Sequence, residues 1–479
     1  MKSLVPLLLL GLAVTVEAQQ QNPEPARFTL EECIQYALDN AVSIKNAAID
    51  EEIADARVKE TRGIGLPQID GTVSLQHNHK LSPFFARAEV AEQLGGVDLN
   101  GLDPADVIAA PNFFQLPSNG NASISVNQIL FNGSYLVGLR AANAYRELSK
   151  RSARQTKEEV IEQVSKAYYT VLINQDRLTL LDNNISRVDS LLKTTEAMYK
   201  NGFAESIDVD RVRVTLNNLV TERDKFNNLQ ELSLQLLKFQ MNYPMARPLA
   251  VEGDIASLQV DETVLQEYAL NWDYTARSDY QLLEANRDLQ QLDVRNKIAA
   301  GLPSLVAFAT AGYSTQSPNI GGLFVTNTNL EESDLIGPDK WYDYSFFGVS
   351  LNVPIFSGLQ RSYRVQQAKL NLMKIENSFS SLKQAIDLEV KQAATSYLNA
   401  IKTLESQREN SELAERVARV TKIKFEQGVG SNLEVIDAES ALKEAQTNYY
   451  NALYDALLAK IDLDKAYGKL APVDTEEKK

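Results

Sequence analysis

The sequence of 479 residues contains one cysteine and two histidines. With Cys33 alone, a disulfide within the chain is excluded. The histidines, His77 and His79, lie two positions apart on a predicted strand without cysteine or carboxylate partners nearby. Such a pair is a weak metal site, and an exposed strand end is the better interpretation. We therefore expect no bound metal.

Motifs that would indicate an enzyme are also missing. The chain has no phosphate-binding loop, no Cys-x-x-Cys and no convincing Ser-His-Asp arrangement, so we expect no catalytic residues, no cofactor and no enzymatic activity. The formal net charge is -15, and no basic patch is long enough to hold a phosphate backbone. Nucleic acid is therefore not an expected partner.

Long apolar runs are confined to the N-terminus. Residues 1–18, "MKSLVPLLLLGLAVTVEA", combine Lys2, an apolar run and small residues at the end, which predicts a cleavable secretory signal and a mature chain from about Gln19. Beyond them no apolar stretch reaches about 18 residues, so no transmembrane helix is predicted. An exported chain of this kind is periplasmic, secreted or a β-barrel.

Proline is absent from residues 134–201 and 359–427, and glycine occurs there only as Gly138. Both segments are rich in Ala, Leu, Gln, Glu and Lys, which predicts two very long helices. At about 1.5 Å per residue each helix would be roughly 100 Å long and would need other helices packed along it. The predicted neighbours are residues 42–63, 206–243, 277–300 and 431–466.

The chain repeats itself once. "GLPQIDGTVSLQ" from Gly65 matches "GLPSLVAFATAG" from Gly301, and "ISVNQILFNGS" from Ile124 matches "VSLNVPIFSGL" from Val349. This order predicts a first structural repeat over residues 19–250 and a second over 251–470. The charged tail, 471–479, is expected to be disordered.

The repeats differ in length mainly between these two motifs. Leu66 to Phe131 is 65 positions, whereas Leu302 to Phe356 is 54. Such a difference is typical of a solvent-exposed loop.

Four segments predict strands, two in each repeat. "FFGVSLNVPIF", from Phe346, alternates apolar and polar residues, and its mate from Ile124 does the same; the segments 66–78 and 302–315 alternate less clearly. Alternation fits a strand between lipid and water, and equally a half-buried strand on a soluble core. Small barrels need about eight strands or more, and an open edge cannot face lipid. A barrel would therefore have to be shared between subunits.

Each long helix is followed by a glycine, and the two glycines occupy equivalent positions in the two repeats. Gly202 and Gly428 predict helix ends, Ser206 and Ser431 predict the N-caps of returning helices, and Ser431 with Glu434 has capping-box spacing. The two regions are therefore predicted hairpin turns. Near the N-terminus "FTLEECIQYALDN" predicts a short helix with a capping box at Thr29 and Glu32.

These features together resemble the TolC family of outer-membrane efflux channels over nearly the whole mature chain. The resemblance rests on the paired LP and FxG motifs, the long arms, the opening "FTLEECIQYALDN" and the turns "NGFAESIDV" and "QGVGSNLEVIDAES". It implies a mostly α fold with a transmembrane β-barrel contribution. A homotrimer would complete a twelve-stranded barrel, four strands per chain, in outer-membrane lipid of a Gram-negative bacterium. Long α-helical hairpins would form a helical barrel in the periplasm.

The resemblance also implies a function and partners. The trimer would be a passive duct that receives small molecules from a periplasmic membrane-fusion adaptor and an inner-membrane pump. The tip residues that match the adaptor contact are Gly202, Phe203, Gly428, Val429 and Gly430. Phe203 and Val429 are apolar residues at predicted turns, which favours a contact.

Three acidic residues match the closed periplasmic entrance of the family. Glu434 and Asp437 share a helix face, and in a trimer six carboxylates near one axis would favour cations. Glu434 is alternatively the capping partner of Ser431. Asp208 matches a position that links the two hairpins, or is simply an acid in the first turn of a helix.

The chain departs from the family pattern at Gly430, where relatives can place an arginine, so a salt bridge that helps to close the entrance is absent. Arg211, Arg213 or Lys424 could substitute.

Three alternatives to an efflux channel stay open. A similar duct serves as the exit of type I protein secretion, and nothing in the duct sequence separates the two. A periplasmic coiled-coil adaptor or scaffold would use the strands as a small soluble sheet. A surface adhesin or stalk would place a long repeated ectodomain outside the cell. The lack of Met and His clusters favours organic compounds over metal ions as substrates.

Overall fold

The computed structural model describes residues 26–94, 101, 103–110, 112, 114–253, 255, 263–270, 272–324 and 341–470. The predicted signal peptide and the tail 471–479 lie outside them. The chain divides into two compact units. The helix unit comprises described residues up to 49, together with 151–281 and 381–470, and the sheet unit comprises 50–150 and 282–380. Each unit takes segments from both sequence repeats, so the boundary at residue 250 stays a prediction.

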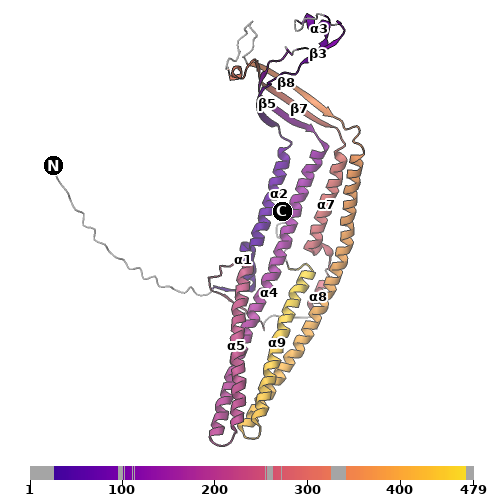
Figure 1. The fold of residues 1–479 in the computed structure, drawn as a ribbon. Helices are drawn as coiled ribbons and strands as arrows, with labels where there is room; N and C mark the ends of the chain where they lie inside the picture. The colour runs from indigo at the N-terminus through magenta and orange to yellow at the C-terminus, as the bar shows by residue number, and fades with distance from the viewer. Residues whose placement is uncertain are drawn as a thin grey trace, which may run out of the picture. The chain divides into compact units, whose positions relative to one another are not determined.

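The two longest helices confirm the prediction closely. Helix α4 is Gly133–Lys200 and α8 is Gln360–Glu426, 68 and 67 residues long. Their partners are α5, Ser206–Met241, and α9, Asn432–Ala466 (Figure 1). Among the described helices none is both long enough and apolar enough to cross a membrane.

In the helix unit, the first repeat is packed by α1, Leu30–Asn40. Its capping box is confirmed, because the Thr29 N–H donates to Glu32 Oε2 at 2.8 Å and the Glu32 N–H donates to Thr29 Oγ1 at 3.3 Å. Fully buried Cys33 and Ala37 face a core built mainly by α4 and the end of α5. The second repeat repeats this arrangement with α6, Thr263–Leu270, against α8 and α9.

A short parallel pair that the sequence did not predict joins β1, Ala26–Phe28, to β6, Leu249–Val251. Leu249 and Val251 are buried in the same core as α1. The pair therefore ties the N-terminal segment to the chain that follows the first hairpin.

Arg277 connects three helices of the helix unit. Its guanidinium, 7% exposed, lies 2.9 Å from an Asp279 oxygen and 2.8 Å from a Glu389 oxygen. It also donates to the carbonyls of Lys465 and Ala466 at the end of α9. Burial lowers the pKa of Arg277, but the hydrogen bonds to both carboxylates outweigh it and hold the pKa above its usual value. These bonds fix the start of α7, Ser278–Ala299, against α8 and α9.

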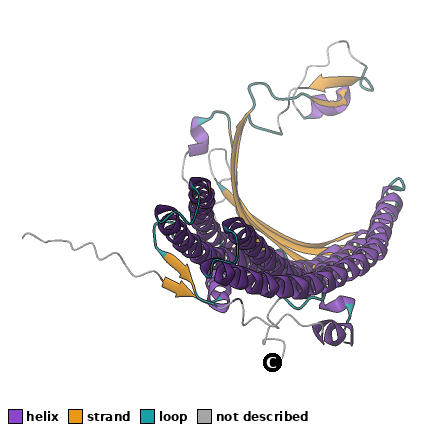
Figure 2. Ribbon diagram, turned by 90° about the horizontal axis from the view of Figure 1, so that it is seen from below, coloured by secondary structure: helices purple, strands orange, loops and turns teal. Residues whose placement is uncertain are grey.

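The sheet unit contains the four predicted strands. They are β2, Gln68–His77; β5, Ser118–Phe131; β7, Ser304–Ser317; and β8, Tyr342–Asn352. They pair antiparallel in the order β2-β5-β7-β8 and form a curved sheet with β2 and β8 at its edges (Figure 2). Helix α2, Val42–Gly63, precedes β2, and α7 precedes β7.

The long loop between β2 and β5 contains a small structure of its own. A hairpin of β3, Phe84–Arg87, and β4, Val107–Ala110, packs with α3, Ala88–Gln93. Ala88, Ala91 and Ala110 are fully buried between them. The loop that differs in length between the repeats is therefore structured in part.

The strand register confirms the sequence repeat. Ile69 of β2 pairs with Val126 of β5, and the residues that match them in the second repeat, Leu305 and Leu351, pair with each other. Because side chains alternate along strands, this register sorts the sheet into two faces. One face carries mostly apolar side chains, including Ile69, Val73, Leu75, Ile124, Val126, Phe347, Val349 and Leu351. The other face is mostly polar.

Cys33 offers a test of the α1 packing. Burial, and next the neighbouring Glu32, raise the pKa of the thiol from 9.0 to about 12. Because the folded chain favours the neutral thiol, the stability from this group is present below pH 9.0 and is lost as pH rises toward about 12. We expect a water-soluble disulfide reagent at pH 8 to leave Cys33 unmodified until the protein is unfolded.

The Val429→Cys variant supplies the control, because position 429 is exposed. It should give one fast-reacting thiol per chain. Rapid reaction of wild-type Cys33 would show that α1 does not stay packed.

Candidate gate and adaptor surface at the hairpin turns

Both hairpins of the helix unit turn in the same way. Gly202 and Gly428 have φ of +80° and +74°, the left-handed region that favours glycine. The next N–H reaches back five residues, from Phe203 to the Met198 carbonyl at 2.8 Å and from Val429 to the Lys424 carbonyl at 3.0 Å. This is the Schellman motif that ends many helices. The predicted helix stops are confirmed.

The residue after each turn glycine presents an apolar side chain to solvent. Phe203 is 82% exposed and Val429 is 80% exposed. In many Schellman motifs this residue packs back on its own helix, which here it does not. Gly430 is half-buried, and a Cβ there would lie 3.2 Å from Lys424 Cβ, so a larger residue would require the turn to shift. The turns therefore form two small apolar projections.

The helices that leave the turns begin differently. Helix α9 begins after Ser431, as predicted, and Ser431 Oγ accepts from the Glu434 N–H at 3.2 Å. The prediction of Ser206 as N-cap is wrong, because α5 starts at Ser206 and its N-cap is Glu205. The Asp208 carboxylate accepts from the Glu205 N–H at 3.3 Å, which places the cap one residue earlier.

The three predicted acidic residues have different surroundings. Glu434 and Asp437 are exposed and lie one turn apart on α9, and neither carboxylate has an ion-pair partner among the described residues. The Asp208 carboxylate, 22% exposed, lies 3.6 Å from Arg211 in its own helix in addition to its capping bond. Asp208 is therefore engaged locally, whereas Glu434 and Asp437 are free to act on solvent.

Asp208 does take part in a link between the hairpins, but through its backbone. Its carbonyl accepts from the side-chain amide of buried Asn432 at 3.1 Å.

Two of the three basic residues that the sequence suggested as substitutes for the missing salt bridge form other ion pairs. Arg211 pairs with Asp208, and Arg213 lies 3.0 Å from Glu196 of α4, both within the first hairpin.

Sequence reasoning missed the ion pairs that join the hairpins. Arg187 Nε of α4 lies 3.1 Å from Glu439 Oε2 of α9, and the Glu439 side chain is only 8% exposed. Lys443 of α9 pairs with Glu222 of α5. Arg187 and Glu439 lie 252 positions apart, so no local spacing reveals them. The sequence repeat aligns the two hairpins, but it does not specify which residues pair across them.

Apolar side chains from all four helices fill the space between these links. Val212 and Val435 are essentially fully buried. The buried cluster consists of Leu181, Val188, Leu191, Val212, Leu219, Phe425 and Val435. The two turns lie side by side (Figure 1) and are held by packing as well as by charge.

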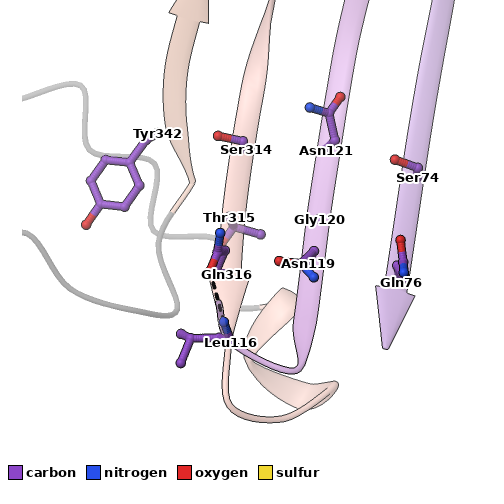
Figure 3. A pocket seen from close by; sticks show the side chains of 10 residues that line it. All are labelled: Ser74, Gln76, Leu116, Asn119, Gly120, Asn121, Ser314, Thr315, Gln316 and Tyr342. Carbon is purple, nitrogen blue, oxygen red and sulfur yellow. Dashed lines mark hydrogen bonds between the residues drawn. The ribbon is translucent and has the colours of Figure 1, made fainter. Parts of the chain in front are cut away.

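In the sheet unit, the polar face is almost uncharged. At one end a hollow of about 540 Å³ is bordered by amide and hydroxyl side chains from all four strands (Figure 3). They include Ser74, Gln76, Asn119, Asn121, Ser314, Gln316 and Tyr342. Over the described strands, the only ionisable carboxylate on this face is that of Asp70. The hollow offers hydrogen bonds without a net charge.

The profile of the outer membrane efflux protein family matches residues 33–235 and 276–469. The chain belongs to this family. The outer membrane protein TolC of Vibrio cholerae is 22% identical over 450 residues, covering 93% of this chain and 92% of TolC. The alkaline protease secretion protein AprF of Pseudomonas aeruginosa is 22% identical, covering 74% of this chain and 71% of AprF. The fold is similar to the crystal structure of the outer membrane protein VceC from Vibrio cholerae, with a TM-score of 0.69 at 15% identity, covering 92% and 96%.

This efflux channel is thus a passive duct of the Gram-negative outer membrane, not an enzyme. Channels of the family are homotrimers that work with a periplasmic adaptor and an inner-membrane pump, and their barrel closes only on trimerisation. The described β2-β5-β7-β8 sheet is one chain's share of that barrel.

The Arg187–Glu439 pair offers a test of the link between the hairpins. In a double-mutant cycle with Arg187→Met and Glu439→Gln, we expect a coupling of about 1–3 kcal/mol, because Glu439 is buried. Native-state hydrogen exchange of the α9 amides measures the local opening free energy.

The Arg419–Glu415 pair of α8, 66% and 60% exposed, is the matched control. Its coupling should be about 0.5 kcal/mol or less. Equal coupling in the two cycles would mean that Arg187 and Glu439 do not hold the hairpins together.

Proposed function

We propose that the hairpin turns of this efflux channel form its periplasmic entrance, and that α9 gives that entrance a preference for cations. The observation that carries the proposal is the pair of exposed carboxylates, Glu434 and Asp437, on one face of α9 without ion-pair partners. Three copies bring six such groups to the entrance. Rings of carboxylates attract cations and repel anions in channels.

The strength of this preference depends on salt. Charges separated by more than about 8–10 Å are largely screened at physiological ionic strength, so the acidic face acts only on ions that pass close to it. Multivalent cations interact with several carboxylates at once and should bind at the entrance more strongly than monovalent ones.

We infer that the entrance is held closed by links behind the turns instead of a salt bridge at position 430. Arg187–Glu439 and Lys443–Glu222 connect α9 to the first hairpin, and Asn432 adds a hydrogen bond to the Asp208 carbonyl. Separating the hairpins would expose Glu439 and the buried valines beside it. Opening therefore requires an energy source, for which adaptor binding is the natural candidate.

The adaptor surface is the pair of projections at the turns. Exposed apolar side chains that lie close together favour a contact site. Phe203 and Val429 supply apolar area, and the glycines beside them let another chain approach the backbone closely. Gly202, Gly428 and Gly430 thus shape the surface, while Phe203 and Val429 supply the binding energy.

The polar face of the sheet favours uncharged or weakly charged substrates over ionic ones. With amides and hydroxyls and a single carboxylate, it provides hydrogen bonds to uncharged or weakly charged organic molecules.

The similarity to AprF, whose name refers to protease secretion, supports a second candidate, the exit duct of a type I secretion system. Loss of drug tolerance on deletion, with an unchanged set of secreted proteins, would favour efflux.

The acidic entrance predicts ion selectivity. In planar bilayers, we expect the Glu434→Gln/Asp437→Asn double variant to lower the cation-over-anion permeability ratio several-fold, because six charges leave the constriction. Block by a trivalent cation added on the side of the hairpin turns should weaken in parallel.

The control variant is Glu415→Gln on α8, which removes an exposed carboxylate away from the turns. It should leave both properties unchanged. Wild-type selectivity in the double variant would remove Glu434 and Asp437 from the gate while leaving the duct intact.

The projections predict adaptor affinity. Phe203→Ser and Val429→Ser should each weaken binding of the purified cognate adaptor by about tenfold, since each loses over 1 kcal/mol of apolar burial. Trimer stability should not change, because both side chains are exposed.

Met245→Ser is the control, since Met245 is half exposed and lies outside the turns. Adaptor binding that tolerates both turn substitutions would place the contact elsewhere on the hairpins.

A further inference from the structure

The four-stranded sheet has two open edges, and both carry apolar side chains on the same face. On β8, Phe347 is 89% exposed, and Val349 and Leu351 are also exposed. On β2, Val73 is 75% exposed, and Ile69 and Leu75 are exposed as well. In lipid an edge strand must find partners for its N–H and C=O groups. A second copy of this chain can supply them, because it carries the complementary edge.

The sheet itself contains the template for that pairing. Each repeat provides two neighbouring strands, and the pairing within a repeat has the same register in both repeats. The contact between β5 and β7 is therefore the junction of one repeat with the next. In a closed ring of repeats, the junction of β8 with β2 of the next copy is the equivalent contact.

The register at this junction can be transferred residue by residue. In β5 and β7, Ile124 pairs with Ala311 and Ser125 pairs with Thr310. The sequence motifs match Ile124 to Val349 and Ala311 to Leu75. They match Ser125 to Ser350, and Thr310 to Ser74. The transferred register sets Val349 opposite Leu75 and Ser350 opposite Ser74.

We propose that β8 pairs antiparallel with β2 of a second copy, with Val349 opposite Leu75, Ser350 opposite Ser74 and Leu351 opposite Val73 of the partner subunit. The proposal concerns the register of the trimer and does not depend on the proposed gate.

The faces of the two strands agree with this register. Val349, Leu351, Leu75 and Val73 all belong to the apolar face, whereas Ser350 and Ser74 belong to the polar face. A shift of one residue would place the apolar side chains of one strand on the same face of the sheet as the polar side chains of the other. Register shifts of one or three residues are therefore excluded, while a shift of two or four must be tested.

The end of β8 provides a second observation. In the first repeat β5 continues to Phe131, because β7 pairs with it that far. The matching residues after Asn352 have no strand beside them, and β8 ends. Ile355 and Phe356 are then left 91% and 80% exposed. Leu130, which matches Ile355, lies at a bulge of β5, and Phe131, which matches Phe356, pairs with Leu305. In the transferred register Phe356 therefore lies opposite Ile69 of the partner subunit, so the second copy both extends β8 and covers these side chains.

Cysteine cross-linking in the intact trimer tests the register. In a Cys33→Ala background, Ser350→Cys with Ser74→Cys and, separately, Val349→Cys with Leu75→Cys should form disulfides between subunits. Opposite residues in antiparallel strands have Cα atoms about 4.5–5.5 Å apart, which a disulfide can span. We expect covalent dimers and trimers on non-reducing gels for at least one of the two pairs.

Two matched variants control the chemistry. Ser125→Cys with Thr310→Cys, and Ile124→Cys with Ala311→Cys, place the same geometries within one chain and should close with loss of free thiols. Pairs shifted along β2, Ser350→Cys with Thr72→Cys or with Asp70→Cys, should link weakly or not at all, since four residues displace the atoms by about 13 Å.

The outcomes separate clearly. Links at a matched pair, with weaker links at the shifted pairs, support the register. Preferential links at a shifted pair overturn it. The register is also overturned if both intrachain controls close while both matched intersubunit pairs stay open in a protein of trimeric native mass.

Discussion

Backbone hydrogen bonding in lipid is the constraint on which the rest of this molecule depends. A chain with four barrel strands has two edges of unpaired N–H and C=O groups, and lipid offers them no partner. The edges must therefore be satisfied by other copies. Once three copies surround one axis, each residue on the inner side occurs three times around the duct. In the entrance that we propose, the two free carboxylates of each chain become rings.

The helix unit and the sheet unit differ in how many charged side chains they carry at the surfaces discussed above. Around the turns, charged side chains are numerous, and in the Arg187–Glu439 pair the carboxylate is buried. On the polar face of the sheet, amides and hydroxyls replace charges, and Asp70 stands alone. Breaking a pair with one buried partner leaves that charge without its counter-ion, which suits the closed entrance that we propose. An uncharged polar wall binds nothing strongly, which suits rapid passage of varied molecules.

The sequence predicted the long helices to within a residue because composition alone determines them. With no proline over 134–201, α4 has nothing to stop it until Gly202. Short elements were beyond such reasoning, since β1 and β6 form only because distant segments meet in a core. Ser206 was misjudged as a cap because Asp208 reaches back to Glu205. The glycine turns were predictable, but the Arg187–Glu439 link depends on tertiary packing that no spacing encodes.

The loop between β2 and β5 has a consequence for how this protein can evolve. The first repeat is longer than the second between the two shared motifs, and its extra residues lie in this loop. Both repeats nevertheless keep the same strand register. The folded piece formed by β3, β4 and α3 has thus been accommodated without any change in the sheet beneath it. Residues outside that folded piece can be gained or lost in the loop without moving the strands, whereas a single deletion inside β5 would turn the side chains beyond it to the opposite face of the sheet. This loop is therefore the part of the sheet unit whose length can change with the least effect on the strands.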